Sequence, residues 1–156
     1  MRGLRLGDGP KGVLRAALFL GGQGFPDDAQ AAASHTSLDL DAWAKTVAAG
    51  TALAAADEVA IELDLPIASA ASDDARSAGP GSGAVTLFHD ANGNGVLDKG
   101  LFGIPREGFG FSANPTIWRG APAFEDCRVY WRGPRPEIVI TMVYLVGALS
   151  RQQHQK

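Results

Sequence analysis

The side chains best suited to chemistry are the oxygen-bearing residues of one short acidic segment, 90–98. Counted from its first residue, oxygen ligands fall at positions 1, 3, 5 and 9, and Gly95 at position 6 allows a sharp turn. Calcium prefers about six to eight hard oxygen ligands on a flexible loop. The segment therefore predicts a weak calcium site with these ligands: Asp90, Asn92, Asn94, Asp98 and the backbone carbonyl of Val96.

This ligand pattern is incomplete at its end, because Leu101 stands at the twelfth position, where calcium loops carry a bidentate glutamate. Glu107 or Asp126 is the candidate that would complete the site from elsewhere in the chain. Without such a ligand we expect an affinity of roughly millimolar order. A metal-free interpretation stays open, since Asn-Gly pairs form tight hairpin turns and Asp and Asn side chains cap their own backbone.

A second kind of chemistry would be hydrolysis by two carboxylates, Glu107 and Asp126, assisted by His89. The sequence does not fix the separation of the carboxylates, and a histidine at a strand end is more often packed against its neighbours. Cys127 lies among apolar and aromatic residues, which favours a small buried hydrophobe over a reactive thiol. We therefore expect no catalytic apparatus and keep the hydrolase as an alternative.

Length and charge limit the classes of function. The chain of 156 residues suffices for one domain, and 46% hydrophobic with 20% charged residues is an ordinary globular balance. The net charge of −3 argues against nucleic-acid binding, which usually needs a basic face. No segment approaches the roughly 20 apolar residues of a membrane span, and no apolar leader of a signal peptide follows Met1 in the chain as given.

The elements that must position these residues are mostly short strands. Apolar patterns bounded by Gly, Pro and Asn predict strands over 13–20, 58–65, 84–89, 128–131 and 137–145. Short helices are expected over 29–33, capped by Asp27, and over 39–56. Since few crossover helices separate the strands, the expected fold is all-β: an antiparallel β-sandwich with one or two short helices in its loops.

The chain is organised as a single domain with one interruption. Residues 1–149 are expected to form the β-sandwich domain, and 150–156 form a polar tail. The small, polar and Gly/Pro/Ser-rich residues 67–83 predict a flexible insertion. Only residues 2–6 precede the first turn, so the first strand looks truncated, which would leave an aggregation-prone sheet edge.

Five aromatic residues crowd a Gly- and Pro-rich stretch beside the acidic segment: Phe102, Phe109, Phe111, Trp118 and Phe124. They are interpretable as an aromatic surface that binds a ligand on irregular backbone. They are equally interpretable as a plug, in which a long loop folds over one end of the domain and buries its rings. We favour the plug as the simpler interpretation.

Three ordered blocks resemble one bacterial family. Residues 88–98 carry a His-Asp-x-Asn-x-Asn-Gly loop, 103–112 a Gly-Ile-Pro block, and 120–126 a Pro-x-Phe-x-Asp block. With 11–26 and 63–66, these blocks are similar to the domain of unknown function 2141 family. The resemblance implies small exported proteins of the periplasm or cell surface, with a sandwich akin to transthyretin-like or immunoglobulin-like domains. It implies no activity, since the family is uncharacterised.

Together the residues and the resemblance lead to one functional expectation and two alternatives. The expectation is a non-enzymatic, periplasmic or secreted module, stabilised by calcium, that binds a protein or glycan of the cell envelope. One alternative is the hydrolase described above. The other is a structural accessory domain whose acidic segment is a metal-free turn.

Overall fold

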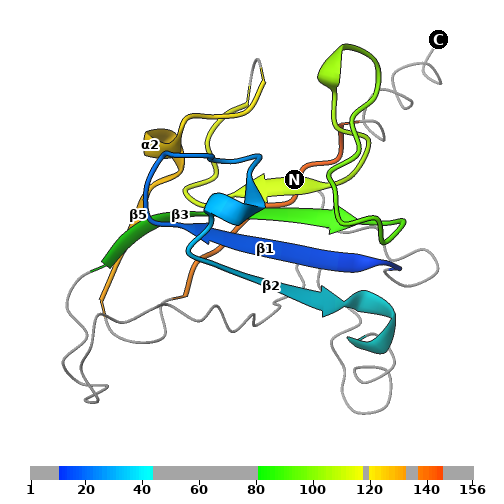
Figure 1. Ribbon diagram of the computed structural model, residues 1–156, viewed down its shortest axis with the longest axis horizontal. Helices are drawn as coiled ribbons and strands as arrows, with labels where there is room; N and C mark the ends of the chain where they lie inside the picture. The colour runs from blue at the N-terminus through cyan, green and yellow to red at the C-terminus, as the bar shows by residue number, and fades with distance from the viewer. Residues whose placement is uncertain (1–10, 44–80, 118–119, 133–136, 146–156) are drawn as a thin grey trace, which may run out of the picture.

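The structure is a computed structural model that describes residues 11–43, 81–117, 120–132 and 137–145, and its strands form one antiparallel sheet (Figure 1). These strands are β1 (Val13–Phe19), β2 (Ser34–Asp39), β3 (Gly81–Asp90), β4 (Phe109–Phe111) and β5 (Val129–Trp131). The order of strands is β2-β1-β3-β4, and β5 pairs with the start of β3. The expected all-β antiparallel fold is thereby confirmed.

Strand β3 is the centre of the sheet. Along one edge it pairs with the whole of β1, from Val13 opposite Asp90 to Phe19 opposite Ala84. Its other edge is shared, because β5 pairs with its first residues and β4 with the stretch from Thr86 onward. The predicted strands at 13–20, 84–89 and 128–131 are all present, and β3 ends where the acidic segment begins.

The sheet buries side chains on both of its faces, as the continuous apolar pattern of 13–20 predicts. Successive residues of a strand point to opposite faces, so Phe19 and Leu18 enter different clusters. One cluster consists of Ala17, Phe19, Ala84, Phe109, Phe111, Phe124 and Cys127. The other consists of Leu18, Val85 and Trp131, with Val129, Ile138 and Ile140 packed against it.

The aromatic stretch divides between the core and the surface. Phe109, Phe111 and Phe124 are buried, and Phe25 packs edge-on against Phe124 with ring centroids 5.6 Å apart. These three rings are buried, as the plug interpretation expects, but Phe109 and Phe111 lie on strand β4 of the sheet and not on a loop folded over its end. Phe102 is 90% exposed and does not belong to the plug. Trp118 lies outside the described residues.

The short helices differ from their predicted positions. The first is η1 (Ala29–Ala31), a single 3-10 turn capped by Asp28, whose carboxylate accepts a hydrogen bond from the Gln30 N–H at 2.9 Å. The predicted cap, Asp27, was therefore wrong by one residue. Two further short helices are η2 (Leu101–Gly103) and α2 (Phe124–Cys127), and residues 40–43 are helical as well. The predicted helix over 39–56 lies mostly outside the described residues.

The polar strand β2 was not anticipated. Its exposed residues alternate with more buried ones, and Ser34 at its start is buried. It is held mainly by backbone pairing with β1, from Val13 opposite Asp39 to Leu18 opposite Ser34. Because a polar outer strand gains little from apolar burial, a hydrophobic pattern does not reveal it.

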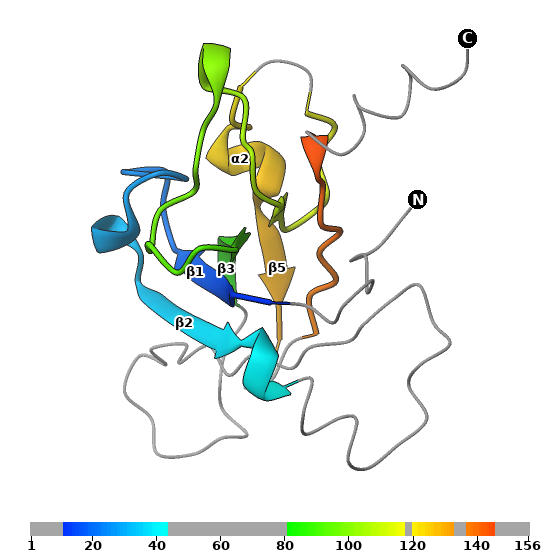
Figure 2. The same ribbon diagram turned by 90° about the vertical axis from the view of Figure 1, so that its right-hand side faces the viewer.

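The last predicted strand, 137–145, is extended, and with partners among the described residues it forms one backbone bridge, between Phe109 and Val143 (Figure 2). The side chain of Asn114 occupies the position of a neighbouring strand. Its amide nitrogen donates to the Val139 carbonyl at 3.0 Å, and its oxygen accepts from the Thr141 N–H at 2.6 Å. The prediction of a regular strand was wrong here because a side chain replaces the ladder.

The predicted insertion and the predicted sandwich are only partly covered by the described residues. Strand β3 begins at Gly81, so the last residues of the predicted insertion 67–83 are strand, and 67–80 lie outside the described residues. The predicted strand 58–65 lies outside them as well. A sandwich requires a second sheet packed face to face with the first. The five described strands belong to one sheet, so the sandwich stays a prediction.

Candidate functional site

The candidate site starts at Asp90, the last residue of β3, whose side chain is fully buried. One carboxylate oxygen, Oδ2, accepts from Arg15 Nε at 2.7 Å and from the Gly95 N–H at 2.8 Å. The other, Oδ1, accepts from the Asn94 N–H at 3.0 Å. The carboxylate therefore joins β1, through Arg15, to the turn of the acidic segment.

The environment of Asp90 keeps it ionised. Burial alone would raise the pKa of this carboxyl, because a charge is poorly solvated inside the protein. The hydrogen bond and charge of Arg15 and the N–H groups of Gly95 and Asn94 outweigh burial, so the pKa of Asp90 lies below its ordinary value. The loop is thus built around a stable buried negative charge that is already neutralised by the protein.

The three other oxygen-bearing side chains of the segment converge on one another. Both amide nitrogens, Nδ2 of Asn92 and Nδ2 of Asn94, donate to the Asp98 carboxylate, at 2.7 and 3.1 Å. The amide oxygens face the backbone instead. Asn92 Oδ1 accepts from the Asn94 N–H at 3.0 Å, and Asn94 Oδ1 accepts from the Val96 N–H at 2.8 Å.

Glu107 closes the segment from its other end. It is buried, its Oε1 accepts from the Ala91 N–H at 2.8 Å, and its Oε2 accepts from the Asp98 N–H at 3.0 Å. One carboxylate therefore bridges the first and last turns of the loop. Glu107 was predicted as a completing metal ligand; the structure places it next to the segment, in a bracing role. Leu97 of the same loop packs against the first core cluster.

The predicted calcium ligands thus lie together, but their oxygens are engaged by N–H groups. Calcium ligation by both asparagines would require the oxygens of Asn92 and Asn94 to turn toward Asp98, where their nitrogens now lie. In the described ranges, no group of three or more His, Cys, Asp or Glu side chains is arranged to hold a metal ion. Calcium binding stays a prediction, with Asp90 to Asp98 as its candidate loop.

Beyond the segment the chain makes a narrow hairpin from Asp98 to Arg106. The Arg106 N–H donates to the Asp98 carbonyl at 2.8 Å, and the Gly100 N–H donates to the Ile104 carbonyl at 2.7 Å. Lys99 and Pro105 form a β-bridge between them. The hairpin is therefore held by its own backbone, and its base is fixed by the same Asp98 that closes the acidic segment.

The end of this hairpin is an exposed group of apolar residues, which we call the apolar tip: Leu101, Phe102 and Ile104. Leu101 is 76% exposed, Phe102 90% and Ile104 38%. Phe102 also has a φ of 60°, a left-handed conformation that bulky residues rarely adopt. From the sequence, Phe102 was named within the aromatic stretch, but Leu101 and Ile104 were not singled out, although an apolar Leu-Phe-Gly-Ile run inside a turn region was a readable signal.

His89 and Asp126, the other candidates for catalysis, have separate surroundings. Nε2 of His89 donates to the Lys11 carbonyl at 2.6 Å, and the Tyr144 hydroxyl lies 3.1 Å from Nδ1. Burial raises the pKa of Tyr144 to about 12, so its hydroxyl keeps its proton and stays available for hydrogen bonding with the histidine. Both ring nitrogens of His89 therefore have partners, which is the packed role that the sequence favoured.

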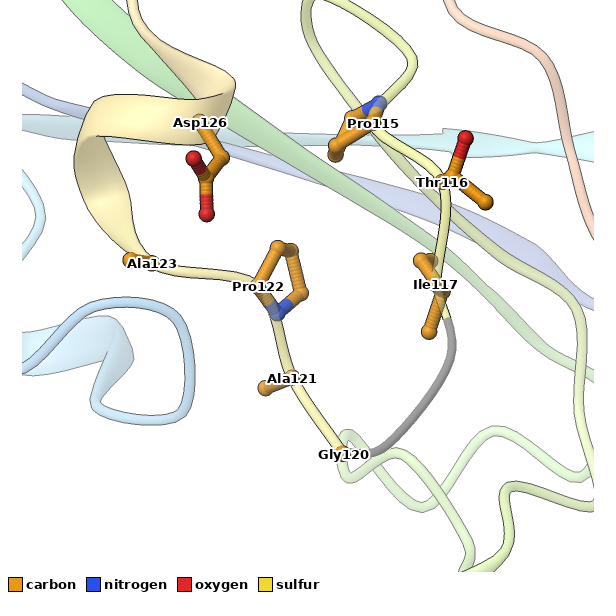
Figure 3. A pocket seen from close by; sticks show the side chains of 8 residues that line it. All are labelled: Pro115, Thr116, Ile117, Gly120, Ala121, Pro122, Ala123 and Asp126. Carbon is orange, nitrogen blue, oxygen red and sulfur yellow. The ribbon is translucent and has the colours of Figure 1, made fainter.

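Asp126 lies in an open pocket of about 570 Å³ beside α2, and its carboxylate points into the space between the two loop segments (Figure 3). The pocket is lined by Pro115, Thr116, Ile117, Gly120, Ala121, Pro122, Ala123 and Asp126. Among the described residues the lining consists mostly of small and apolar side chains, and Asp126 is its one charged group.

The structure does not bring Asp126 and Glu107 together. The residue after Asp126 is fixed at the level of Val85, since Ser112 Oγ accepts from the Val85 N–H and donates to the Cys127 carbonyl. Glu107 contacts the backbone just beyond the end of β3. The intervening strand spans roughly 17 Å. The carboxylate pairs of glycosidases lie about 5 to 9.5 Å apart.

Comparison with known proteins gives one match. A family model described as an uncharacterized protein conserved in bacteria (DUF2141) matches residues 8–138. The matched range includes the acidic segment, the hairpin, the apolar tip and the pocket beside α2. No curated protein and no solved structure matches the chain.

Proposed function

Because the chain belongs to the DUF2141 family of uncharacterized bacterial proteins, we propose its function from the site itself: it is a non-catalytic module that binds a partner through the apolar tip. The observation that carries this proposal is the exposure of Leu101 and Phe102 on a hairpin with an internally paired backbone. Three exposed apolar residues clustered at one turn contribute nothing to the core, and such clusters mark interaction sites.

The backbone of Phe102 supports the proposal. Its left-handed conformation costs on the order of 1 kcal/mol for a residue with a side chain. Such a conformation persists only where neighbouring contacts hold the backbone in place, and it occurs preferentially at functional positions. Here it presents a phenyl ring to solvent, so the cost is unexplained by packing and is consistent with a ring held ready for a partner.

The base of the hairpin supports a binding role as well. Asp90 and Glu107 fix both ends of the acidic segment, and Asp98 connects that segment to the hairpin. A surface that is ordered before binding loses less conformational entropy when its partner arrives. We propose that the acidic segment serves as this support, with or without calcium.

Two finer parts of the proposal rest on family resemblance and on chemistry. The resemblance to exported proteins favours a place in the periplasm or at the cell surface, and a partner in the envelope. The absence of catalysis is supported by the engaged carboxylates of Asp90 and Glu107 and by the two partners of His89. A hydrolase built on Glu107, Asp126 and His89 has no comparable support.

Site-specific photo-cross-linking tests the proposed function. A benzophenone amino acid would replace Phe102 in the full chain, expressed in a bacterium that encodes it, and would replace Val139 in a matched control. Val139 is 71% exposed and lies on the segment after β5, where its carbonyl accepts a hydrogen bond from Asn114. We expect a discrete adduct from position 102 and none from position 139. Identical patterns at both positions would contradict a binding role for the tip.

A further inference from the structure

We propose that the partner of the apolar tip is a lipid surface with anionic headgroups, into whose outer layer Leu101, Phe102 and Ile104 insert. This inference rests on the proposed function of the tip and names the class of its partner. Within the described residues, no helix is long and apolar enough to cross a membrane. The contact proposed here is peripheral, by a loop that enters only the interface.

The shape of the tip is the first argument. The hairpin projects away from the sheet in both views (Figures 1 and 2). A projecting ring such as Phe102 needs a matching pocket on a protein partner, whereas lipid is deformable and apolar and needs none. Leu101 and Phe102 are adjacent, large and more than three-quarters exposed, so they form a compact wedge at the end of the hairpin.

The hydrogen bonds of the tip are the second argument. The N–H groups of Gly100, Gly103 and Ile104 donate to carbonyls inside the hairpin, at 2.7, 3.2 and 3.5 Å. Backbone groups that enter lipid unpaired are costly, so internal pairing is a requirement for insertion. Among the described residues the N–H groups of Leu101 and Phe102 have no backbone partner. Insertion should therefore stop at the headgroup boundary, where water and phosphate remain available.

The charges at the base of the tip are the third argument. Lys99 and Arg106 are both exposed and stand on opposite arms of the hairpin, just below the apolar residues. Lys99 forms an ion pair with Asp27, in which Nζ lies 3.2 Å from Oδ1. Arg106 has no ion pair in the described part of the chain. Basic groups beside an inserted apolar wedge lie at the level of anionic headgroups and are attracted to them.

Of the acidic groups nearest this base, Asp27 is exposed and pairs with Lys99, and the others are turned inward. Asp90 and Glu107 are buried, and their oxygens accept hydrogen bonds from Arg15 and from backbone N–H groups. The Asp98 carboxylate is covered by the amides of Asn92 and Asn94. The hairpin itself therefore turns its anions inward, and among the described residues Arg106 is its exposed cation without an ion pair, which suits an anionic lipid surface better than a basic protein.

Vesicle flotation with the full chain tests the inference. The vesicles contain either phosphatidylglycerol and phosphatidylcholine in equal parts or phosphatidylcholine alone, at low ionic strength. We expect the wild-type chain to float with the anionic vesicles. The double substitution L101D/F102D should lower the partition coefficient by about a hundredfold, because each large apolar side chain contributes roughly tenfold. Val139→Asp, at an exposed site elsewhere, should leave it unchanged.

A second variant separates charge from apolar insertion. Arg106→Gln should weaken binding to anionic vesicles by roughly fivefold and leave binding to phosphatidylcholine unchanged. The inference is overturned if the wild-type chain floats with neither vesicle, or if L101D/F102D and Val139→Asp lose binding equally. A protein adduct from position 102, together with absent flotation, would overturn the lipid partner and keep the proposed function. Loss of both signals would overturn both.

Discussion

At the scale of single residues, the buried Asp90 decides whether the loop keeps its shape. Its carboxylate is shared by Arg15 of β1 and by two N–H groups of the turn, so the strand and the loop depend on the same group. A buried carboxylate of this kind stabilises only while all its partners are present, because an unpaired buried charge is costly. The predictions at this scale follow from that dependence.

Removing the charge of Asp90 should destabilise the fold. In Asp90→Asn the neutral amide no longer forms the ion pair with Arg15. Its nitrogen also cannot accept the hydrogen bond that one carboxylate oxygen takes from a backbone N–H of the turn. The free energy of unfolding should therefore fall by about 2 kcal/mol. Urea denaturation measures this difference. Asp27→Asn is the control, since its pair with Lys99 is exposed and should contribute less than about 1 kcal/mol. Equal losses in both variants would contradict the role of Asp90.

The same carboxylate predicts a pH dependence. The pKa of Asp90 is lowered in the folded state from the ordinary value of 3.8, so its contribution to the free energy of unfolding is complete above that pH. It is lost as the pH falls through the lower, folded-state pKa. Unfolding measured from pH 7 downward should therefore show the gap between wild type and Asp90→Asn closing below about pH 3.8. A constant gap would count against this assignment.

Cys127 should be chemically inert in the folded protein. It is fully buried, and burial, helped by the charge of Asp126, raises its pKa to about 11. At pH 8 roughly one thiol in a thousand is then ionised, and the thiolate is the reactive form. A disulfide reagent should label Cys127 only when the chain is unfolded. Rapid labelling under native conditions would show that the thiol is accessible.

The sequence predicted which oxygen-bearing residues meet, and it missed how they bond. Asp90, Asn92, Asn94, Asp98 and Glu107 do lie together. The engagement of their oxygens depends on Arg15, which is 75 residues away in the chain, and on N–H groups whose direction is set by the folded loop. Spacing alone carries no information about either. The apolar tip was not predicted, because hydrophobic periodicity indicates buried faces of strands and helices and not exposed apolar turns.

At the scale of elements, the acidic segment offers a direct test between a calcium loop and a metal-free turn. A ligand bound only by the folded state stabilises it by mass action. With a dissociation constant of roughly 1 mM, about 10 mM calcium should add about 1.4 kcal/mol and raise the melting temperature by a few degrees relative to excess chelator. This rise should vanish in Asp98→Asn.

Magnesium at the same concentration serves as the control for general ionic effects on this loop, because it prefers a small octahedral shell that the segment does not provide. An equal shift with both ions, or no shift with either, would leave Asp90 to Asp98 as a turn closed by its own hydrogen bonds. The bracing by Glu107 and the support of the hairpin would be unaffected by that outcome.

Elements were predictable where burial shaped the sequence. Strand β1 is apolar on both faces and was found to within one residue, and the central part of β3 was found while its start at Gly81 was assigned to the insertion. Strand β2 is polar and joins the sheet through its backbone, so its pattern is uninformative. The segment 137–145 has the expected alternation, yet its regular ladder is replaced by Asn114, an interaction that lies outside any local pattern.

At the scale of the whole molecule, stability should depend most on the residues where the faces of the sheet are covered. Phe19 is 1% exposed and packs edge-on against Phe25, with ring centroids 5.3 Å apart. Phe19→Ala should lower the free energy of unfolding by about 3 to 5 kcal/mol through lost burial and a cavity. Tyr130→Ala, at a largely exposed ring, should change it by less than about 1 kcal/mol.

Urea denaturation of both variants checks this expectation, provided that the dependence of the free energy of unfolding on urea concentration is the same as in the wild type. A loss for Tyr130→Ala as large as that for Phe19→Ala would mean that the exposed face of β5 is covered in solution, for example by a second copy of the chain. The same pair of variants therefore reports on the core and on the surface.

The central position of β3 has a consequence for the time the chain needs to fold. Phe19 pairs with Ala84 and Val13 with Asp90, so β1 can pair with β3 only after the long chain segment between them has closed. The β1–β2 and β3–β4 pairings join strands that are much closer in the chain. Proteins dominated by distant pairings fold in milliseconds to seconds, since long loops must close before contacts reward them. We therefore expect slow folding, with substitutions in β3 slowing it more than substitutions in β2.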